Sequence, residues 1–391
     1  MKKILYIFDD VNYKNGVQKV TFYQIEELIK YYEIAVFSLC KPGDELKEKN
    51  FYLKWIGERI WDKTEIFSKS LTDILQSNKY SWKQKGMRVF YGVWRRWKRK
   101  SAFLDNILEE EKEEFENYDV IIVVSEASKM KKFVSTLKGV KKIQWIHTNY
   151  GLWSEFSDWT REITKDDKNI YSNYDVVVTL SESNKEAFLE KIPELEKKVV
   201  VIPNMISVKE ITEKAEEICN IEIKKEALSF VTVGRLEKEK GIDRLLNICK
   251  RLKKKKDFIW YIIGTGTLEK HIKEKIEQEN LKENVILLGE LENPYPVIKQ
   301  CDIFALLSYY EGTPVTIEEA MILNKYIIAT DIGGIKEQVK NYEKVRFVKN
   351  DIESIESGLT ELLEMDKDIW KEQSSYIDKK EENIQKLINL F

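Results

Sequence analysis

Three cations and two glycines lie in one short segment of the sequence, between an apolar run and a helical pattern. The segment, residues 233–241, reads Val-Gly-Arg-Leu-Glu-Lys-Glu-Lys-Gly. Arg235 offers a planar fork of donors and Lys240 a mobile point charge, a pair that suits a diphosphate. Gly234 permits tight backbone geometry beside them. A charged surface loop is the alternative interpretation, because charged residues make up 34% of the chain.

A second segment, residues 263–267 (Ile-Gly-Thr-Gly-Thr), also lies between an apolar run and a helical pattern. It is shorter than the full dinucleotide-binding glycine motif. Gly264 and Gly266 would let a ligand or a neighbouring backbone come close. Packing and ligand binding therefore both remain open for this turn.

The third segment, residues 308–321, predicts an anion site at the start of a helix. Pro314 suits the first helical position, and Thr313 before it suits the N-cap. The backbone N–H groups of Val315 and Thr316 would then lie at the positive end of the helix, where anions bind.

Two carboxylates flank this helix start. Glu311 lies in the loop before it and Glu319 about two turns into it. A carboxylate accepts hydrogen bonds from neighbouring hydroxyls, as on a ribose or a hexose, so carboxylates beside a phosphate site suit a nucleotide sugar. A favourable charge at the helix dipole would explain Glu318 or Glu319, but not Glu311 beside Gly312.

These segments need a scaffold, which short Val- and Ile-rich runs predict. The runs alternate with helical patterns such as 241–252 and 268–279, and each is apolar on both faces, as in parallel strands covered by helices. This order predicts an α/β fold of doubly wound parallel sheets. The eleven predicted strands are 4–8, 34–39, 120–124, 143–146, 176–180, 199–202, 228–233, 258–263, 285–288, 303–307 and 326–329.

The length of 391 residues favours two domains. Because the pattern restarts near residue 227, we expect a first domain at 1–205 and a second at 206–366. Residues 367–391 read as helical and are expected to pack back on the first domain. Residues 50–105 fit the alternation poorly and are interpreted as a basic, aromatic insertion.

Composition excludes several other classes of protein. The net charge of −2 argues against a nucleic-acid binder. The four cysteines are scattered and the two histidines lie far apart, so a reducing compartment is expected and a His-rich metal site is not. No stretch approaches the ~18–20 apolar residues of a membrane span. These features predict a cytoplasmic protein.

At this point the sequence resembles a known family. Glu311 and Glu319 match the E-x7-E signature of the family 4, or group 1, glycosyltransferases, whose GT-B fold has two Rossmann-like domains facing a cleft. Residues 234–241 resemble the diphosphate loop of that family. Gly264, Gly266, Leu288 and Gly289 fall where its nucleotide-binding turns fall.

The likeness continues more thinly in the first half. Residues 8–20 resemble the family's loop after the first strand, although Gly16 stands where the family usually has paired glycines. His147 follows a strand, as does the cleft histidine of family members. A lone histidine is also compatible with a structural role.

The resemblance implies a retaining, metal-independent transfer of a hexose-type sugar from UDP or GDP, with UDP favoured and no cofactor. Arg235, Lys240 and the start of the helix at Val315 and Thr316 would neutralise the departing diphosphate. Glu319 would hold ribose hydroxyls and Glu311 the donor sugar. His147 would contact that sugar from the opposite wall, and no covalent nucleophile stands out, which favours front-face attack.

The acceptor is expected to be a glycan or a lipid-linked oligosaccharide of cell-surface or capsular polysaccharide synthesis. Residues 81–100 carry eight Lys or Arg interleaved with aromatic residues. Such a segment favours peripheral contact with an anionic membrane, here at the inner face of the cell membrane. A solvated helix whose aromatics pack on the core is the alternative.

Three other functions fit the sequence less well. A nucleotide-sugar epimerase of the same fold would modify its donor without an acceptor. A non-catalytic partner that binds sugar nucleotides or glycans would not need Arg235, Lys240, Glu311 and Glu319 together. A nicotinamide dehydrogenase lacks support, because the full glycine motif and its downstream acid are missing.

Overall fold

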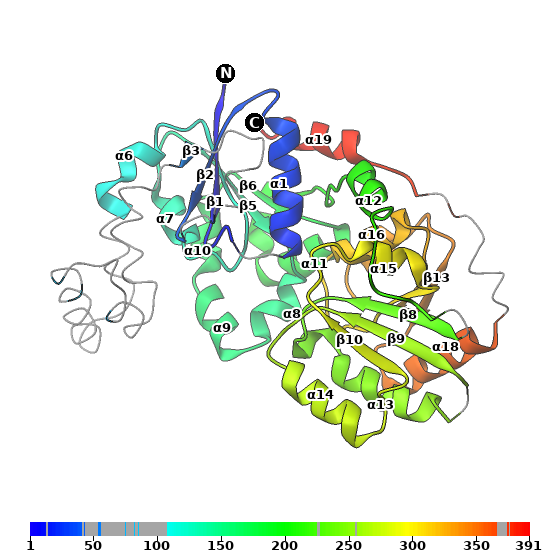
Figure 1. The fold of residues 1–391 in the computed structure, drawn as a ribbon. Coiled ribbons are helices and arrows are strands. Elements are labelled where there is room, and N and C mark those ends of the chain that lie inside the picture. Colours follow the sequence, from blue (N-terminus) through cyan, green and yellow to red (C-terminus); the bar gives the residue numbers. More distant parts are fainter. Residues whose placement is uncertain are drawn as a thin grey trace.

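The structure is a computed structural model of the chain, shown in Figure 1. It describes residues 1–12, 15–40, 108–224, 227–254, 256–365 and 376–391, together with the single positions 43, 75, 82, 85 and 374 and the pair 54–55. Most of the predicted insertion at 50–105, including nearly all of the basic aromatic segment 81–100, lies outside the described residues. Its membrane contact stays a prediction.

The first domain is built on a parallel sheet of seven strands in the order β3-β2-β1-β4-β5-β6-β7. Its strands are β1 Lys3–Phe8, β2 Glu33–Ser38, β3 Lys54–Trp55, β4 Val120–Val123, β5 Lys141–Ile146, β6 Val176–Thr179 and β7 Val199–Val201. Its helices are α1 Gly16–Leu28, α6 Lys112–Phe115, α7 Lys131–Thr136, α8 Tyr150–Glu155, α9 Asp158–Thr164, α10 Asp167–Ser172 and α11 Glu182–Lys191, followed by the 3-10 turn Pro193–Lys198.

The second domain repeats the plan with six parallel strands in the order β10-β9-β8-β11-β12-β13. Its strands are β8 Leu228–Val233, β9 Phe258–Ile263, β10 Val285–Gly289, β11 Ile303–Leu306, β12 Tyr326–Thr330 and β13 Val345–Val348. Its helices are α12 Val208–Lys214, α13 Ile242–Leu252, α14 Glu269–Gln278, α15 Tyr295–Gln300, α16 Val315–Ile322, α17 Ile335–Gln338 and α18 Ile352–Glu364, with a 3-10 turn at Lys238–Lys240.

The sequence of β1 shows why both faces of the sheets are covered. Successive side chains of a strand point to opposite faces. Leu5 and Ile7 join the core on one face, whereas Ile4, Tyr6 and Phe8 join the core on the other. An apolar run of this kind needs helices on both sides, which confirms the predicted doubly wound α/β fold.

All eleven predicted strands are present, and β3 and β13 are additional. The predicted helix over 367–391 is only partly correct: residues 376–379 are not helical, and the helix α19 spans Lys380–Ile388.

Helix α19 lies beside α1 at the first domain, although it follows the second domain in sequence (Figure 1). Ile384 and Leu387 belong to the core of the first sheet, and the ring of Phe391 meets that of Tyr32 edge-on. The end of the chain is thereby packed on the domain that contains its beginning. No helix among the described residues is both long and apolar enough to span a bilayer.

Candidate active site

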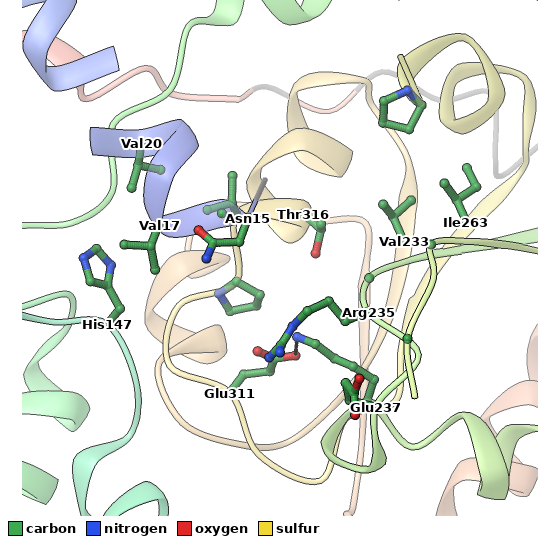
Figure 2. A pocket seen from close by; sticks show the side chains of 18 of the residues that line it. Asn15, Val17, Val20, His147, Val233, Arg235, Glu237, Ile263, Glu311 and Thr316 are labelled. Atoms are coloured by element: carbon green, nitrogen blue, oxygen red, sulfur yellow. Dashed lines mark hydrogen bonds and ion pairs between the residues drawn. The ribbon is translucent and has the colours of Figure 1, made fainter. Parts of the chain in front are cut away.

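A cleft of about 920 Å³ lies between the two domains, at the carboxyl ends of their parallel strands. This is the edge at which doubly wound sheets bind ligands. Figure 2 shows His147 of the first domain across the cleft from Arg235 and Glu311 of the second. Eleven of the predicted site residues line the cleft: Gly16, His147, Gly234, Arg235, Lys240, Gly264, Gly266, Glu311, Thr313, Val315 and Thr316.

Lys240 and Glu311 form an ion pair inside this cleft. The Lys240 Nζ–Glu311 Oε1 distance is 2.5 Å, and Ser308 Oγ donates to the same oxygen at 2.7 Å. Their side chains are only 19% and 11% exposed, so water screens the pair poorly. Lys240, which is predicted to bind the diphosphate, and Glu311, which is predicted to bind the sugar, therefore lie together in the cleft.

The buried guanidinium of Arg244 holds the loop that carries Glu311. Arg244 on α13 is 2% exposed and donates to the backbone oxygens of Leu307 and Ser308, the latter at 2.7 Å. Its guanidinium also lies 4.1 Å from the ring centroid of Tyr309. Because these bonds fix the backbone just before Glu311, Arg244 positions that carboxylate.

Arg235 is the more exposed cation of the site. Its side chain is 52% exposed, and its Nη2 pairs with Glu239 at 2.9 Å on the neighbouring 3-10 turn. Arg235 and Lys240 thus both reach the cleft, which a plain surface loop would not require.

The glycine turns pack against one another as well as lining the cleft. Gly264 has a φ of +135°, and a Cβ there would lie 2.0 Å from the backbone oxygen of Gly234. A Cβ at Gly266 would lie 2.5 Å from the oxygen of Leu236. Close backbone packing therefore requires these glycines, and ligand binding does not need to be invoked for their presence.

Helix α16 presents its amino end to the cleft. It begins at Val315, and the backbone N–H groups of Val315 and Thr316 have no acceptor among the described residues. Two orphan donors at the positive end of a helix form a site for an anion.

The predicted cap of this helix is wrong by one residue. Pro314 occupies the N-cap and Thr313 lies outside the helix. Thr313 instead joins the domains: its hydroxyl accepts from Asn184 Nδ2 at 3.3 Å and its carbonyl from Asn204 Nδ2 at 2.9 Å. Its polar atoms are used for contacts with the first domain and its linker, so they do not cap the helix.

Glu319 does not line the cleft. Its side chain is 7% exposed, and Oε1 is paired with Lys19 of α1 and accepts from Tyr295 Oη at 3.2 Å. The residue predicted to hold ribose hydroxyls is therefore engaged across the domain interface.

His147 follows β5 and lines the cleft from the first domain. Its Nε2 is buried without a hydrogen-bond partner in the described part of the chain. Burial lowers the pKa of the imidazole, while the Glu126 carboxylate and a backbone hydrogen bond with Val124 act in the opposite direction. The burial effect is the largest, so the neutral ring is favoured.

Glu126 holds the turn that carries His147. It is 2% exposed and accepts from the backbone N of His147 at 3.2 Å and of Thr148 at 3.1 Å. The Thr148 hydroxyl donates to it at 2.6 Å. A buried carboxylate with these donors fixes the direction in which the imidazole enters the cleft.

Three further predicted donor-binding residues do not line the cleft but pack next to residues that do. Gly312 packs on the first domain, where a Cβ would lie 2.1 Å from the His147 oxygen. Gly289, with φ +71°, ends β10, and its oxygen accepts from the Gly264 N–H at 2.7 Å. Leu288 packs against the core. Their neighbours Glu290 and Leu291 line the cleft instead.

Sequence reasoning missed several residues that the fold brings to the site. Asn15, Asn204, Glu237 and Pro294 line the cleft, while Lys19 and Glu126 act on Glu319 and His147. Glu126 gave a signal, since an acid two residues after the apolar run 120–124 lies at the functional edge of a parallel sheet. No group of three or more His, Cys, Asp or Glu gathers as a metal-ligand set within the described ranges.

Comparisons with known proteins agree with this geometry. The model of Glycosyltransferase Family 4 matches residues 14–210, and that of Glycosyl transferases group 1 matches residues 213–383. A Campylobacter jejuni N-acetylgalactosamine-N,N'-diacetylbacillosaminyl-diphospho-undecaprenol 4-alpha-N-acetylgalactosaminyltransferase is 32% identical over 200 residues, 51% of this chain and 53% of that protein. An Escherichia coli UDP-Gal:alpha-D-GlcNAc-diphosphoundecaprenol alpha-1,3-galactosyltransferase is 27% identical over 194 residues, 47% and 50% of the two chains. The chain spans about half the length of these curated relatives.

Solved structures share the whole fold. TarM of S. aureus, in complex with UDP among other ligands, superposes with a TM-score of 0.69 at 15% identity, covering 100% of this chain and 99% of that one. Anabaena HepE, in complex with UDP and glucose, gives 0.69 at 13% identity, with 100% and 97% covered. Together with the two family models that cover both domains, these likenesses confirm the GT-B fold, and the chain belongs to glycosyltransferase family 4, the group 1 glycosyl transferases.

Proposed function

We propose that this glycosyltransferase moves a hexose-type sugar from a nucleotide diphosphate donor to a lipid-linked glycan acceptor, with retention of configuration and without a metal ion. UDP is the favoured nucleotide and GDP the alternative. The observation that carries the proposal is the Lys240–Glu311 pair beside the orphan N–H groups of α16, within one cleft between two domains.

The donor would bind with its diphosphate at the start of α16. There the N–H groups of Val315 and Thr316, with Lys240 and Arg235, supply fixed positive charge where negative charge develops on the departing diphosphate. These groups act in a partly enclosed cleft, where electrostatic stabilisation is stronger than in water. They supply the charge that a metal ion would otherwise provide.

The transferred sugar would lie between Glu311 and His147. Glu311 Oε1 is occupied by Lys240 and Ser308, so the carboxylate is held in one orientation and can accept from sugar hydroxyls through its other oxygen. The neutral imidazole of His147 can donate or accept one hydrogen bond. No covalent nucleophile is assigned, and the acceptor hydroxyl would attack on the face from which the diphosphate leaves.

The acceptor is inferred from relatives rather than from the cleft. The names of the Campylobacter jejuni and Escherichia coli proteins both describe a sugar linked to diphosphoundecaprenol as the acceptor. By this likeness we place the reaction in cell-surface polysaccharide synthesis, at the cytoplasmic face of the membrane. Contact with anionic lipid through residues 81–100 is part of the same proposal.

Thermal-shift measurements with a panel of UDP- and GDP-sugars test the donor, because a ligand that binds only the folded protein raises its melting temperature. We expect one nucleotide class to stabilise the protein, in EDTA as in buffer. Donor incubated without acceptor should yield only slow hydrolysis. Conversion of the donor to an epimer would identify the rival activity, and no shift with any nucleotide sugar would reject the proposal.

Variants then assign roles to the residues. Arg235→Ala should lower turnover of the identified donor, and Glu319→Ala should weaken donor binding. Normal turnover and normal binding in both variants would remove these residues from the site.

A further inference from the structure

One ion pair crosses from the first domain to the helix that opens the donor site. Lys19 lies one turn into α1, and its ammonium pairs with Glu319 Oε1 on α16. The same ammonium hydrogen-bonds Tyr295 Oη and lies 4.8 Å from the centroid of that ring. The Lys19 side chain is 32% exposed, whereas that of Glu319 is 7% exposed.

This pair occupies the carboxylate of Glu319, which the family resemblance assigns to the ribose hydroxyls. Neutral hydroxyls that replace Lys19 at Glu319 Oε1 would leave the ammonium without its carboxylate partner. A partly buried charge that loses its partner is costly unless another anion takes its place. A nucleoside alone brings no such anion, but a nucleotide diphosphate does.

The two helices place that anion within reach of Lys19. A Cβ at Gly16, the first residue of α1, would lie 3.2 Å from Val315 Cγ2, the first residue of α16. One turn further along, Lys19 meets Glu319. Contacts at both levels mean that α1 and α16 run side by side, with both amino ends at the cleft.

The distance that the ammonium must cover is short. Glu319 follows Val315 by four residues, a rise of about 6 Å along a helix. A lysine has a flexible four-carbon stem and a point charge that needs no fixed geometry. Lys19 can therefore reach from Glu319 to an anion at the N–H groups of Val315 and Thr316 without movement of its backbone.

We propose that Lys19 is a donor-binding residue supplied by the first domain, which exchanges Glu319 for the diphosphate when the nucleotide binds. The inference rests on the proposed function and adds a residue to its site. Lys19 then holds Glu319 in the empty enzyme and frees it for the ribose in the loaded one. The diphosphate becomes the bridge between the domains.

The exchange predicts that one substitution, Lys19→Met, changes the affinities for a nucleotide and for its nucleoside in opposite directions. The substitution removes the ammonium that competes with the ribose for Glu319, and it also removes a cation that would bind the diphosphate. We expect the Kd of UDP to rise about tenfold, the scale of a lost charge-assisted hydrogen bond, and the Kd of uridine to fall. Ligand-observed NMR measures both constants, with GDP and guanosine titrated in parallel.

Two further variants serve as comparisons. Lys19→Arg keeps the charge and should retain the wild-type ratio of the two constants to within a few-fold. Lys30→Met removes a lysine that follows α1, is 59% exposed and pairs with Glu27 at 2.9 Å, and it should change neither constant.

The outcomes separate this inference from the proposed function. If the wild-type protein binds neither UDP nor GDP, both the exchange and the proposed function are rejected. If the wild-type protein binds one of them, either of two results for Lys19→Met overturns the exchange and leaves the proposed function standing. One is an unchanged ratio of the nucleoside Kd to the nucleoside diphosphate Kd, and the other is no detectable nucleoside binding.

Discussion

At the scale of the residue, His147 shows how burial sets the chemistry of the cleft. Its Nε2 is buried and has no hydrogen-bond partner among the described residues, and the pKa of the imidazole is lowered chiefly by that burial. The folded protein therefore binds fewer protons at this site than the unfolded chain does. Protonation below the ordinary histidine pKa of about 6.5 must destabilise the fold.

This gives a pH prediction. From pH 8 down to about 6.5, His147 should contribute no pH dependence; below that, the free energy of unfolding should fall by up to about 1.4 kcal/mol per pH unit. His147→Gln should show a shallower decline than the wild type in urea unfolding between pH 7 and 5. His271→Gln, at an exposed position, should follow the wild type. Equal slopes in all three proteins would contradict the assignment.

Sequence reasoning succeeded at residues with a strong local signal. Arg235, Lys240 and Glu311 were brought together as expected, because each follows a parallel strand and the carboxyl ends of such strands share one edge. Lys19 lies inside the segment 8–20 that resembles the family's loop after the first strand, but as one of 65 Lys and Arg residues it gave no signal of its own. Its role depends on how the two domains meet, which no local pattern specifies.

At the scale of the element, α16 is bound on its far side by the segment that leads to α19. Tyr376 Oη donates to Glu318 Oε1 at 2.7 Å. Burial raises the pKa of Glu318 to about 7, with Asp378 and Glu319 adding to the rise and Tyr376 and Lys19 opposing it. Helix α16 thus carries a carboxyl group that resists ionisation.

Replacement of that carboxyl group should stabilise the protein in alkaline solution. The folded chain keeps the Glu318 proton up to about pH 7, whereas the unfolded chain loses it near pH 4.5, so stability falls as pH rises through this window. Glu318→Gln should raise the unfolding free energy by about 3 kcal/mol at pH 8, and by less than about 1 kcal/mol at pH 5. Exposed Glu283→Gln is the matched control. A gain that is equal at both pH values would count against this explanation.

The elements themselves were largely predictable, and the misses have local causes. The long Val- and Ile-rich runs became central strands. Strand β13 was missed because its four residues, Val345–Val348, include an arginine and resemble no buried run. The cap of α16 was misplaced because Thr313 has the chemistry of an N-cap, yet its polar atoms bind Asn184 and Asn204. Tertiary contacts overrode a local preference.

At the scale of the whole molecule, the domains are joined at several points around the cleft. Glu337 on α17 accepts from the backbone N–H groups of Glu182 and Ser183 at the start of α11, both at 2.8 Å. The Phe156 and Tyr310 rings meet at 5.0 Å on the side of Glu311. With the Lys19 pair, these contacts join the two domains at separate points around the cleft.

Helix α19 makes a separate contribution, which a core variant measures. Leu387 is fully buried in the core of the first sheet. Leu387→Ala should lower the unfolding free energy by about 2–5 kcal/mol, as for other buried leucines. Lys386→Ala, with a side chain that is 43% exposed, should change it by less than about 0.5 kcal/mol in the same urea titration. Equal effects would mean that α19 does not stabilise the first domain.

The most direct test of the proposed donor site is a calorimetric titration of UDP- and GDP-sugars in EDTA, with wild-type protein and Lys240→Met. Lys250→Met, which removes a 51% exposed lysine paired with Glu279 at 2.6 Å, is the control. We predict that one nucleotide class binds without metal, and that its Kd rises at least about tenfold in Lys240→Met and not in the control. No binding to the wild type, or equal binding to all three proteins, would contradict a nucleotide diphosphate sugar site in this cleft.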